Sequence, residues 1–160
     1  MNVRLPILAP LCALLFFTTA CVKNSRFYAS SRIHASGWAI NDTLHFEDSL
    51  GAETPSQLHA TLSLRNNTTY PYQNLWLYIK KELPQSDQIQ TDSIMCTLSD
   101  PLGNWTGKGW GSLFETSIQL PDIQWKPTDS VRFFRISIVH GMKDSILPGI
   151  EDIHLRLHTD

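Results

Sequence analysis

Apolar and polar residues alternate with a period of two along much of this chain from residue 36 onward, and this pattern constrains the fold most strongly. Successive side chains of a β-strand point to opposite faces, so such alternation is typical of strands with one buried and one solvated face. The clearest segments are residues 58–65, 75–80, 134–138 and 153–158. Beyond residue 21, no segment combines a 3.6-residue apolar period with helix caps. The sequence therefore predicts an all-β protein.

Clusters of turn-forming residues separate the alternating segments, at Asn66–Thr69, Asp100–Gly103 and Pro148–Gly149 among others. Seven to nine strands with this punctuation predict a single antiparallel β-sandwich over residues 36–160. A jelly-roll-like and an immunoglobulin-like strand order both remain open, because alternation does not say which strands pair. The chain's 160 residues are the length of one domain.

The N-terminus has the layout of a secretory signal peptide, with Arg4 before an apolar stretch at residues 5–17. Thr18–Cys21 then resembles a bacterial lipobox, in which a small residue precedes the cysteine; Thr18 stands where leucine is usual. We therefore expect a lipoprotein signal peptide at residues 1–20 and lipid on Cys21. The alternative is ordinary cleavage after Ala20, with Cys21 as an incidental first residue.

Residues 21–35 are interpreted as the lipidated cysteine followed by a flexible tether, because residues 22–35 are polar and lack periodicity. No aspartate follows Cys21 directly, and no acidic run follows it either. Both absences favour the periplasmic leaflet of an outer membrane over inner-membrane retention or surface export. The membrane, through a lipid anchor, is thus the first expected partner.

Cysteine usage agrees with lipidation. Cys12 leaves with the signal peptide and Cys21 carries the lipid, so Cys96 remains alone and the mature domain has no internal disulfide. Cys96 lies in an apolar segment and is expected to be a small buried side chain rather than a reactive thiol.

Composition excludes several classes of protein. A hydrophobic fraction of 42% is too high for a disordered chain, and a net charge of −2 lacks the basic excess of nucleic-acid-binding proteins. No set of acid–base or nucleophilic residues has catalytic spacing, so no enzyme activity and no cofactor are expected. His154 and His158 lie about 13 Å apart along one strand face. We expect them to face solvent and to bind no metal.

A glycine-rich stretch, Gly103–Ser112, contains Trp105 and Trp110. It lacks the spacing of a phosphate-binding loop, and its alternating glycines indicate a bulged turn where backbones approach closely. Large aromatic side chains most often pack in a core, but those near this stretch also suit a contact surface for a partner protein or a glycan. The candidate contact residues are Tyr70, Tyr72, Asn74, Trp76, Trp105, Lys108 and Trp110.

The pattern Asp, then Ser or Thr, then an aliphatic residue occurs five times. It resembles the O-glycosylation acceptor motif of Bacteroidetes periplasmic proteins. The alternative is that the same residues form turns that lead into β-strands. The candidate acceptors are Thr43, Ser49, Ser93, Ser130 and Ser145.

The order of several motifs resembles the gliding motility lipoprotein GldH family of Bacteroidetes. The matching segments are Leu64–Leu77, Asp100–Ser112, His140–Met142 and Leu147–Ile153. His154, where a small residue is expected, and the Thr18 lipobox depart from the family pattern.

The resemblance implies an outer-membrane lipoprotein that works alongside the gliding and type IX secretion machinery. It implies no enzymatic activity, and no catalytic or ligand-binding residue is carried over. Our first hypothesis is therefore a non-catalytic, lipid-anchored β-sandwich that contacts other envelope proteins in the periplasm. The alternative is a β-sandwich module that binds envelope glycans through the same aromatic residues.

Overall fold

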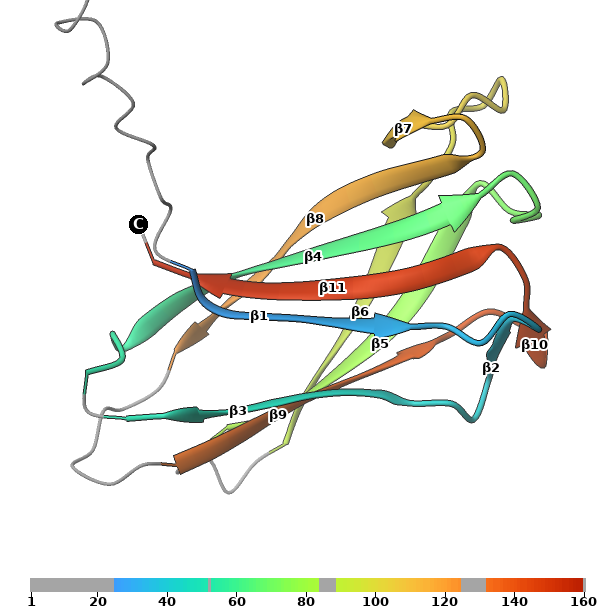
Figure 1. The fold of residues 1–160 in the computed structure, drawn as a ribbon. Coiled ribbons are helices and arrows are strands. Elements are labelled where there is room, and N and C mark those ends of the chain that lie inside the picture. The colour runs from blue at the N-terminus through green and yellow to red at the C-terminus, as the bar shows by residue number, and fades with distance from the viewer. Residues whose placement is uncertain (1–24, 52, 84–88, 125–131, 160) are drawn as a thin grey trace, which may run out of the picture.

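The computed structural model describes residues 25–51, 53–83, 89–124 and 132–159. All regular structure in these ranges is β-strand, arranged in antiparallel sheets (Figure 1), which confirms the predicted all-β sandwich. The strands are β1 (Ser25–Arg32), β2 (Trp38–Ala39), β3 (Leu44–Leu50), β4 (Gln57–Asn67), β5 (Asn74–Glu82), β6 (Gln90–Thr97), β7 (Lys108–Trp110), β8 (Leu113–Gln124), β9 (Arg132–His140), β10 (Ile146–Leu147) and β11 (Ile150–His158).

The two main sheets have the strand orders β1-β11-β4-β8-β7 and β3-β9-β5-β6, and β10 pairs with β2. β2, β7 and β10 have only two or three residues, too few for an alternating pattern to be recognised. The eight longer strands pair as β1 with β11, β3 with β9, β4 with β8 and β5 with β6. Each strand thus pairs with its counterpart counted from the other end of the chain. This is the order of a jelly roll, and it decides the alternative that the sequence left open.

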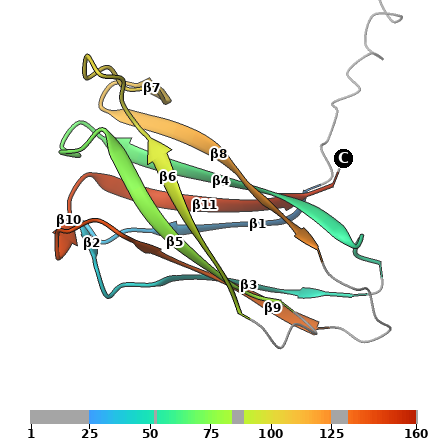
Figure 2. The same cartoon turned by 180° about the vertical axis from the view of Figure 1, so that it is seen from behind.

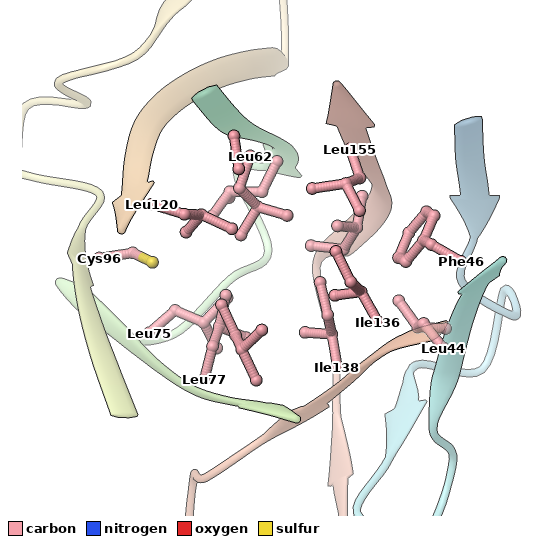
Figure 3. Close-up of a cluster of buried hydrophobic side chains, with 14 of the residues drawn as sticks. Leu44, Phe46, Leu62, Leu75, Leu77, Cys96, Leu120, Ile136, Ile138 and Leu155 are labelled. Carbon is pink, nitrogen blue, oxygen red and sulfur yellow. The ribbon is translucent and has the colours of Figure 1, made fainter. Parts of the chain in front are cut away.

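The core lies between the two sheets, where the inward positions of the alternating segments meet (Figure 3). Leu62 of β4 and Leu155 of β11 face Leu77 of β5 and Ile136 of β9, and all four side chains are fully buried. Cys96 is also buried in this core, as predicted, and burial raises the pKa of its thiol to about 12. A thiol with this pKa stays protonated near neutral pH, which supports a packing role.

The predicted tether is wrong for most of its length, because residues 25–32 form strand β1. From Phe27 to Arg32 this strand pairs residue by residue with β11. Phe27 and Ala29 point inward, and the Phe27 ring packs edge-to-face on Phe134 at 5.4 Å. The alternation is hard to see in the sequence because the next inward residue is Ser31. The domain therefore begins by Ser25, and residues 1–24 lie outside the described part of the chain.

The two ends of the sandwich differ. At one end, Ser25 of β1 pairs with His158 of β11, beside the C-terminus (Figure 1). At the other end lie the β4–β5 loop, β7, and the turn between β10 and β11, as Figure 2 shows from behind. We call this second end, formed by residues 67–73, 98–112 and 141–149, the loop end.

Candidate functional site

The loop end is held together through the β4–β5 loop. The backbone N–H of Asn67 donates to Gly149 O at 2.8 Å, and the N–H of Leu98 donates to Gln73 O at 2.8 Å. Gly149 has a φ of 80°, and a Cβ at this position would lie 2.3 Å from the backbone N of Tyr70. Only glycine permits this conformation and this close approach. The Pro148–Gly149 turn, part of a segment that resembles the GldH family, therefore allows close packing against the β4–β5 loop.

Two tyrosines of the candidate contact set fasten the same loop. Tyr70 is buried, and its hydroxyl donates to Asn74 O at 2.7 Å. The Tyr72 hydroxyl donates to Asp144 Oδ2 at 2.6 Å, and the two tyrosine rings lie 5.9 Å apart. Burial raises the pKa of Tyr70, and the hydrogen bond to Asp144 raises that of Tyr72. Both phenols therefore stay protonated and donate their hydrogen bonds at neutral pH.

The turn that begins at Asp100 is organised by the Asp100 carboxylate. It accepts hydrogen bonds from the backbone N–H of Leu102 and from both the backbone and the side-chain amide of Asn104, at 2.8–2.9 Å. These bonds, those of Asn104 first, lower the pKa of Asp100 below its usual value. This Asx-type turn accounts for the Asp, Gly and Asn residues of the motif.

The glycine-rich stretch is a close-packed turn, as the sequence predicts. β7 pairs with the start of β8, and a Cβ on Gly109 would lie 2.2 Å from Leu113 O. The Trp105 ring is half-buried and stacks on Phe114 at 5.6 Å. Trp110, five residues later, is 97% exposed and lies in β7, and Lys108 is also exposed. The two tryptophans of one motif thus have different roles.

The candidate contact residues separate into two groups. Tyr70, Tyr72 and Trp105 pack within the loop end, and Asn74 supplies a backbone acceptor. Trp76, Trp110 and Lys108 reach solvent.

The structure adds residues that the sequence reasoning missed. Leu102 is 88% exposed in the turn that begins at Asp100. On the outer face of the four-stranded sheet, Trp76 pairs across strands with Met95, and Tyr78 lies two residues further along β5. All three side chains are at least 40% exposed, and we call them the apolar patch. The signal was present: period-two alternation places Trp76 and Tyr78 on one outward face of β5. The pairing with Met95, however, requires the register of the sheet.

The five candidate O-glycosylation acceptors lie in different surroundings. Ser49 in β3, Ser93 in β6 and Ser145 before β10 are exposed, whereas Thr43 is half-buried just before β3. Ser130 lies outside the described residues. The first three are sterically accessible, and modification of all five remains a prediction.

A second cluster, absent from the predicted site, lies on the outer face of the five-stranded sheet. Arg65 of β4 binds the Asp152 carboxylate with both Nε and Nη2. His154 Nε2 lies 2.8 Å from Asp152 Oδ1, and its Nδ1 lies 2.8 Å from the Tyr28 hydroxyl. His154 is thus half-buried and hydrogen-bonded rather than simply solvent-facing, and His158 is buried. The pattern Asp152-x-His154 places both residues on one strand face, which was the available signal.

Asp152 gives this cluster a defined pH dependence. Burial opposes ionisation of Asp152, but the Arg65 hydrogen bonds and charge, together with His154, lower its pKa below the usual value. A carboxylate whose pKa is lower in the folded state stabilises the fold above its unfolded pKa, near 3.9. That contribution is lost as the pH falls through the lower, folded pKa.

We therefore predict that Asp152→Asn reduces the free energy of unfolding by about 1–3 kcal/mol at about pH 7, because a charged hydrogen-bond partner of Arg65 is lost. The difference from wild type should shrink at about pH 3, as measured by urea unfolding. Glu47→Gln, which breaks the exposed pair with Arg135, is the control and should have little effect at either pH. An equal loss at both pH values would contradict this assignment.

The described residues include no group of three or more His, Cys, Asp or Glu side chains placed to hold a metal ion. In the same part of the chain, no helix is long and apolar enough to cross a bilayer.

Comparison with known proteins identifies relatives of the chain. Residues 26–157 match the sequence profile of the family described as "GldH lipoprotein". A curated protein of Christiangramia forsetii, "Gliding motility lipoprotein GldH homolog", is 27% identical over 152 residues, which cover 87% of this chain and 86% of that protein.

Among solved structures, the infectious bursal disease virus VP2 subviral particle aligns at a TM-score of 0.27 and 14% identity, over 82% of this chain. The structure of the Gx strain of infectious bursal disease virus aligns at a TM-score of 0.18 and 15% identity, over 84% of this chain. The chain spans only about a third of these viral chains, 30% and 35% respectively. The profile match extends over nearly the whole described domain, from β1 to β11. The chain belongs to the GldH lipoprotein family.

Proposed function

We propose that this protein is a non-catalytic lipoprotein of the gliding and type IX secretion machinery, which acts by contacting other envelope proteins through its loop end. The observation that carries the proposal is the exposure of Trp110 (97%) and Leu102 (88%) on a loop end that is otherwise closely hydrogen-bonded. Large apolar side chains presented to water on a rigid support are typical of protein contact sites. The nearby apolar patch extends the candidate surface onto the four-stranded sheet.

The position at which β1 begins supports this arrangement. Ser25 lies at the end of the sandwich opposite the loop end (Figure 1). Cys21 precedes it by four residues, a separation of at most about 14 Å in extended chain. A lipid on Cys21 therefore holds the Ser25 end near the bilayer and leaves the loop end pointing away from it. This orientation suits a protein that meets its partners in the periplasm from the inner leaflet of the outer membrane.

The aromatic residues favour protein contact over glycan binding at the loop end. A sugar-binding platform needs exposed rings that lie side by side. Tyr70 is instead buried, Trp105 is half-buried against Phe114, and the Tyr72 hydroxyl is occupied by Asp144. Only Trp110 and Trp76 of the predicted rings are widely exposed.

Site-specific photo-crosslinking in the native envelope tests the proposal. We expect a photoreactive residue at Trp110 or Met95 to give discrete crosslinked proteins. The same residue at Phe133 should give none, because Phe133 is 79% exposed but lies at the far end of β9 from the loop end. The double variant Trp110→Ser, Leu102→Ser should reduce co-purification of the crosslinked protein by about ten-fold or more, as expected for hot-spot residues. Equal crosslinking from all three positions, or none from Trp110 and Met95, would refute the proposal.

A further inference from the structure

The outer face of the five-stranded sheet faces the viewer in Figure 1. The strand registers give this face a regular grid of polar side chains. The strand registers place outward side chains of β1, β11, β4 and β8 in three parallel rows. From one row to the next these are Tyr28, Arg156, Thr61 and Gln119; Ser30, His154, Ser63 and Ser117; and Arg32, Asp152, Arg65 and Glu115. With strands about 4.8 Å apart and rows about 6.7 Å apart, the grid measures roughly 13 by 14 Å.

This face is hollowed. A depression of about 520 Å³ is lined by nine residues of the four strands, all of them polar or aromatic, and no aliphatic side chain contributes to it. A second hollow of about 550 Å³ begins at Glu115 and Ser117 and extends over Gly107 and Lys108. A concave polar surface of this size has room for an oligosaccharide and exceeds what a simple anion fills.

Side chains in the floor of the hollow are fixed by hydrogen bonds, both within a row and between neighbouring rows. Thr61 donates to Gln119 at 3.0 Å, and the hydroxyls of Ser63 and Ser117 lie 2.7 Å apart. Because Asp152 is an ionised acceptor, His154 Nε2–H donates to it at 2.8 Å, and His154 Nδ1 lies 2.8 Å from the Tyr28 hydroxyl. The Tyr28 ring, 63% exposed, stacks on His154 at 5.8 Å. The chain thus holds an aromatic ring in one position at the rim of the hollow.

One cation in the hollow is not neutralised. Arg65 is paired with Asp152, but Arg156 has no carboxylate partner among the described side chains. Arg156 stands between Tyr28 and Thr61 in the first row. Glu115 lies in the third row, and its negative charge disfavours a ligand that carries several negative charges. A guanidinium without a partner, beside a fixed aromatic ring, suits a ligand with a single carboxylate.

We propose that this hollow binds a saccharide that carries a carboxylate. Hydroxyl, amide and guanidinium groups arranged without aliphatic neighbours match the hydroxyls of a sugar, the Tyr28 ring offers a stacking face, and Arg156 receives the acid. A peptide fits this surface less well, because peptides use a free strand edge or apolar pockets, and the hollow lies on the middle of a sheet face. This site is separate from the loop end and does not depend on the proposed partner contact.

Calorimetric titration of the lipidated protein in detergent tests the site. The probes are glucuronate and sialyllactose as saccharides with a single carboxylate, lactose as the neutral counterpart of the latter, and inorganic phosphate as a simple anion. We expect at least one acidic saccharide to bind, lactose to bind about ten-fold more weakly than sialyllactose or not at all, and phosphate not to displace the bound saccharide.

Variants locate the binding. Arg156→Gln should weaken binding by about ten-fold or more, and Tyr28→Ala, on an edge strand, provides a second variant that removes the stacking ring. Arg135→Gln is the matched control, because Arg135 is an exposed arginine on the outer face of the other sheet; it should bind as wild type does. Failure of both acidic saccharides to bind, equal affinity for lactose, displacement by phosphate, or unchanged binding in both hollow variants would overturn the proposal. Thermal unfolding of each variant confirms that it is folded.

Discussion

Replacing Gly149 by alanine is expected to destabilise the protein more than the same change at any other glycine of the loop end that lies outside β7. The residue has a φ of 80°, which costs an alanine about 1–2 kcal/mol. The added Cβ would also lie 2.3 Å from the backbone N and 2.6 Å from Cα of Tyr70. Because these are backbone atoms, relief requires the β4–β5 loop to move, which adds about 1–3 kcal/mol. Urea unfolding followed by tryptophan fluorescence measures the loss.

Gly103→Ala separates the two contributions. Gly103 has a φ of 87°, but no atom lies within 4 Å of a Cβ built there. This variant should therefore show only the cost of the backbone conformation, about 1–2 kcal/mol. Because Gly149 contacts the loop that holds Tyr70, Gly149→Ala should also weaken photo-crosslinking at Trp110, whereas Gly103→Ala should weaken it less. Equal destabilisation by the two variants would contradict the packing explanation.

Replacing Cys21 by alanine is expected to release the protein from the membrane. Each buried methylene contributes about 0.8 kcal/mol, so one acyl chain binds reversibly and several chains bind essentially permanently. The lipobox resemblance implies a diacylglycerol on the Cys21 thiol and an acyl group on its amino terminus, three acyl chains in all, and Cys21→Ala removes the site at which the diacylglycerol is attached. Cell fractionation should find the wild-type protein in the membrane pellet and the variant in the soluble periplasmic extract.

Cys96→Ala is the matched control for this experiment. Cys96 lies in the core with its side chain 1% exposed, so it carries no lipid and its replacement should leave the protein in the pellet. Intact-mass measurement should show the lipid on wild-type protein and on Cys96→Ala, but not on Cys21→Ala. If Cys21→Ala stayed in the pellet after a salt wash, the anchor would lie elsewhere and the proposed orientation of the loop end would lose its basis.

Much of the fold followed from local pattern. Leu62, Leu64, Leu75 and Leu77 occupy alternate positions, and all four are fully buried between the sheets. The chain turns at Thr68–Thr69, directly after β4, and at Pro101–Gly103, within two of the predicted turn segments. The strands can be predicted in this way because burial on one sheet face imposes a period of two on the sequence itself. β1 escaped this reasoning, since its inward positions include Ala29 and Ser31 and its outward positions include Tyr28.

The candidate site could be predicted only in part from the sequence. The sequence pointed to Tyr70, Trp105 and Trp110 together, because all three are aromatic and lie near turns. The structure separates them: Tyr70 is buried beneath Gly149, Trp105 stacks on Phe114, and Trp110 reaches solvent. Exposure of an aromatic ring depends on what the rest of the chain places over it, and a local sequence window does not contain that information.

The sequence by itself determined the strand character of the domain, the family, the buried position of Cys96 and the expected lipid site at Cys21. The strand character, the position of Cys96 and the lipid site depend on residues that are near one another in the chain, and the family depends on the order of such local motifs along it. Only the tertiary structure decided the jelly-roll pairing, the cross-strand pairing of Trp76 with Met95, and the row that joins Tyr28, Arg156, Thr61 and Gln119. These depend on which distant strands pair and in which register, and that is set by the packing of the whole core.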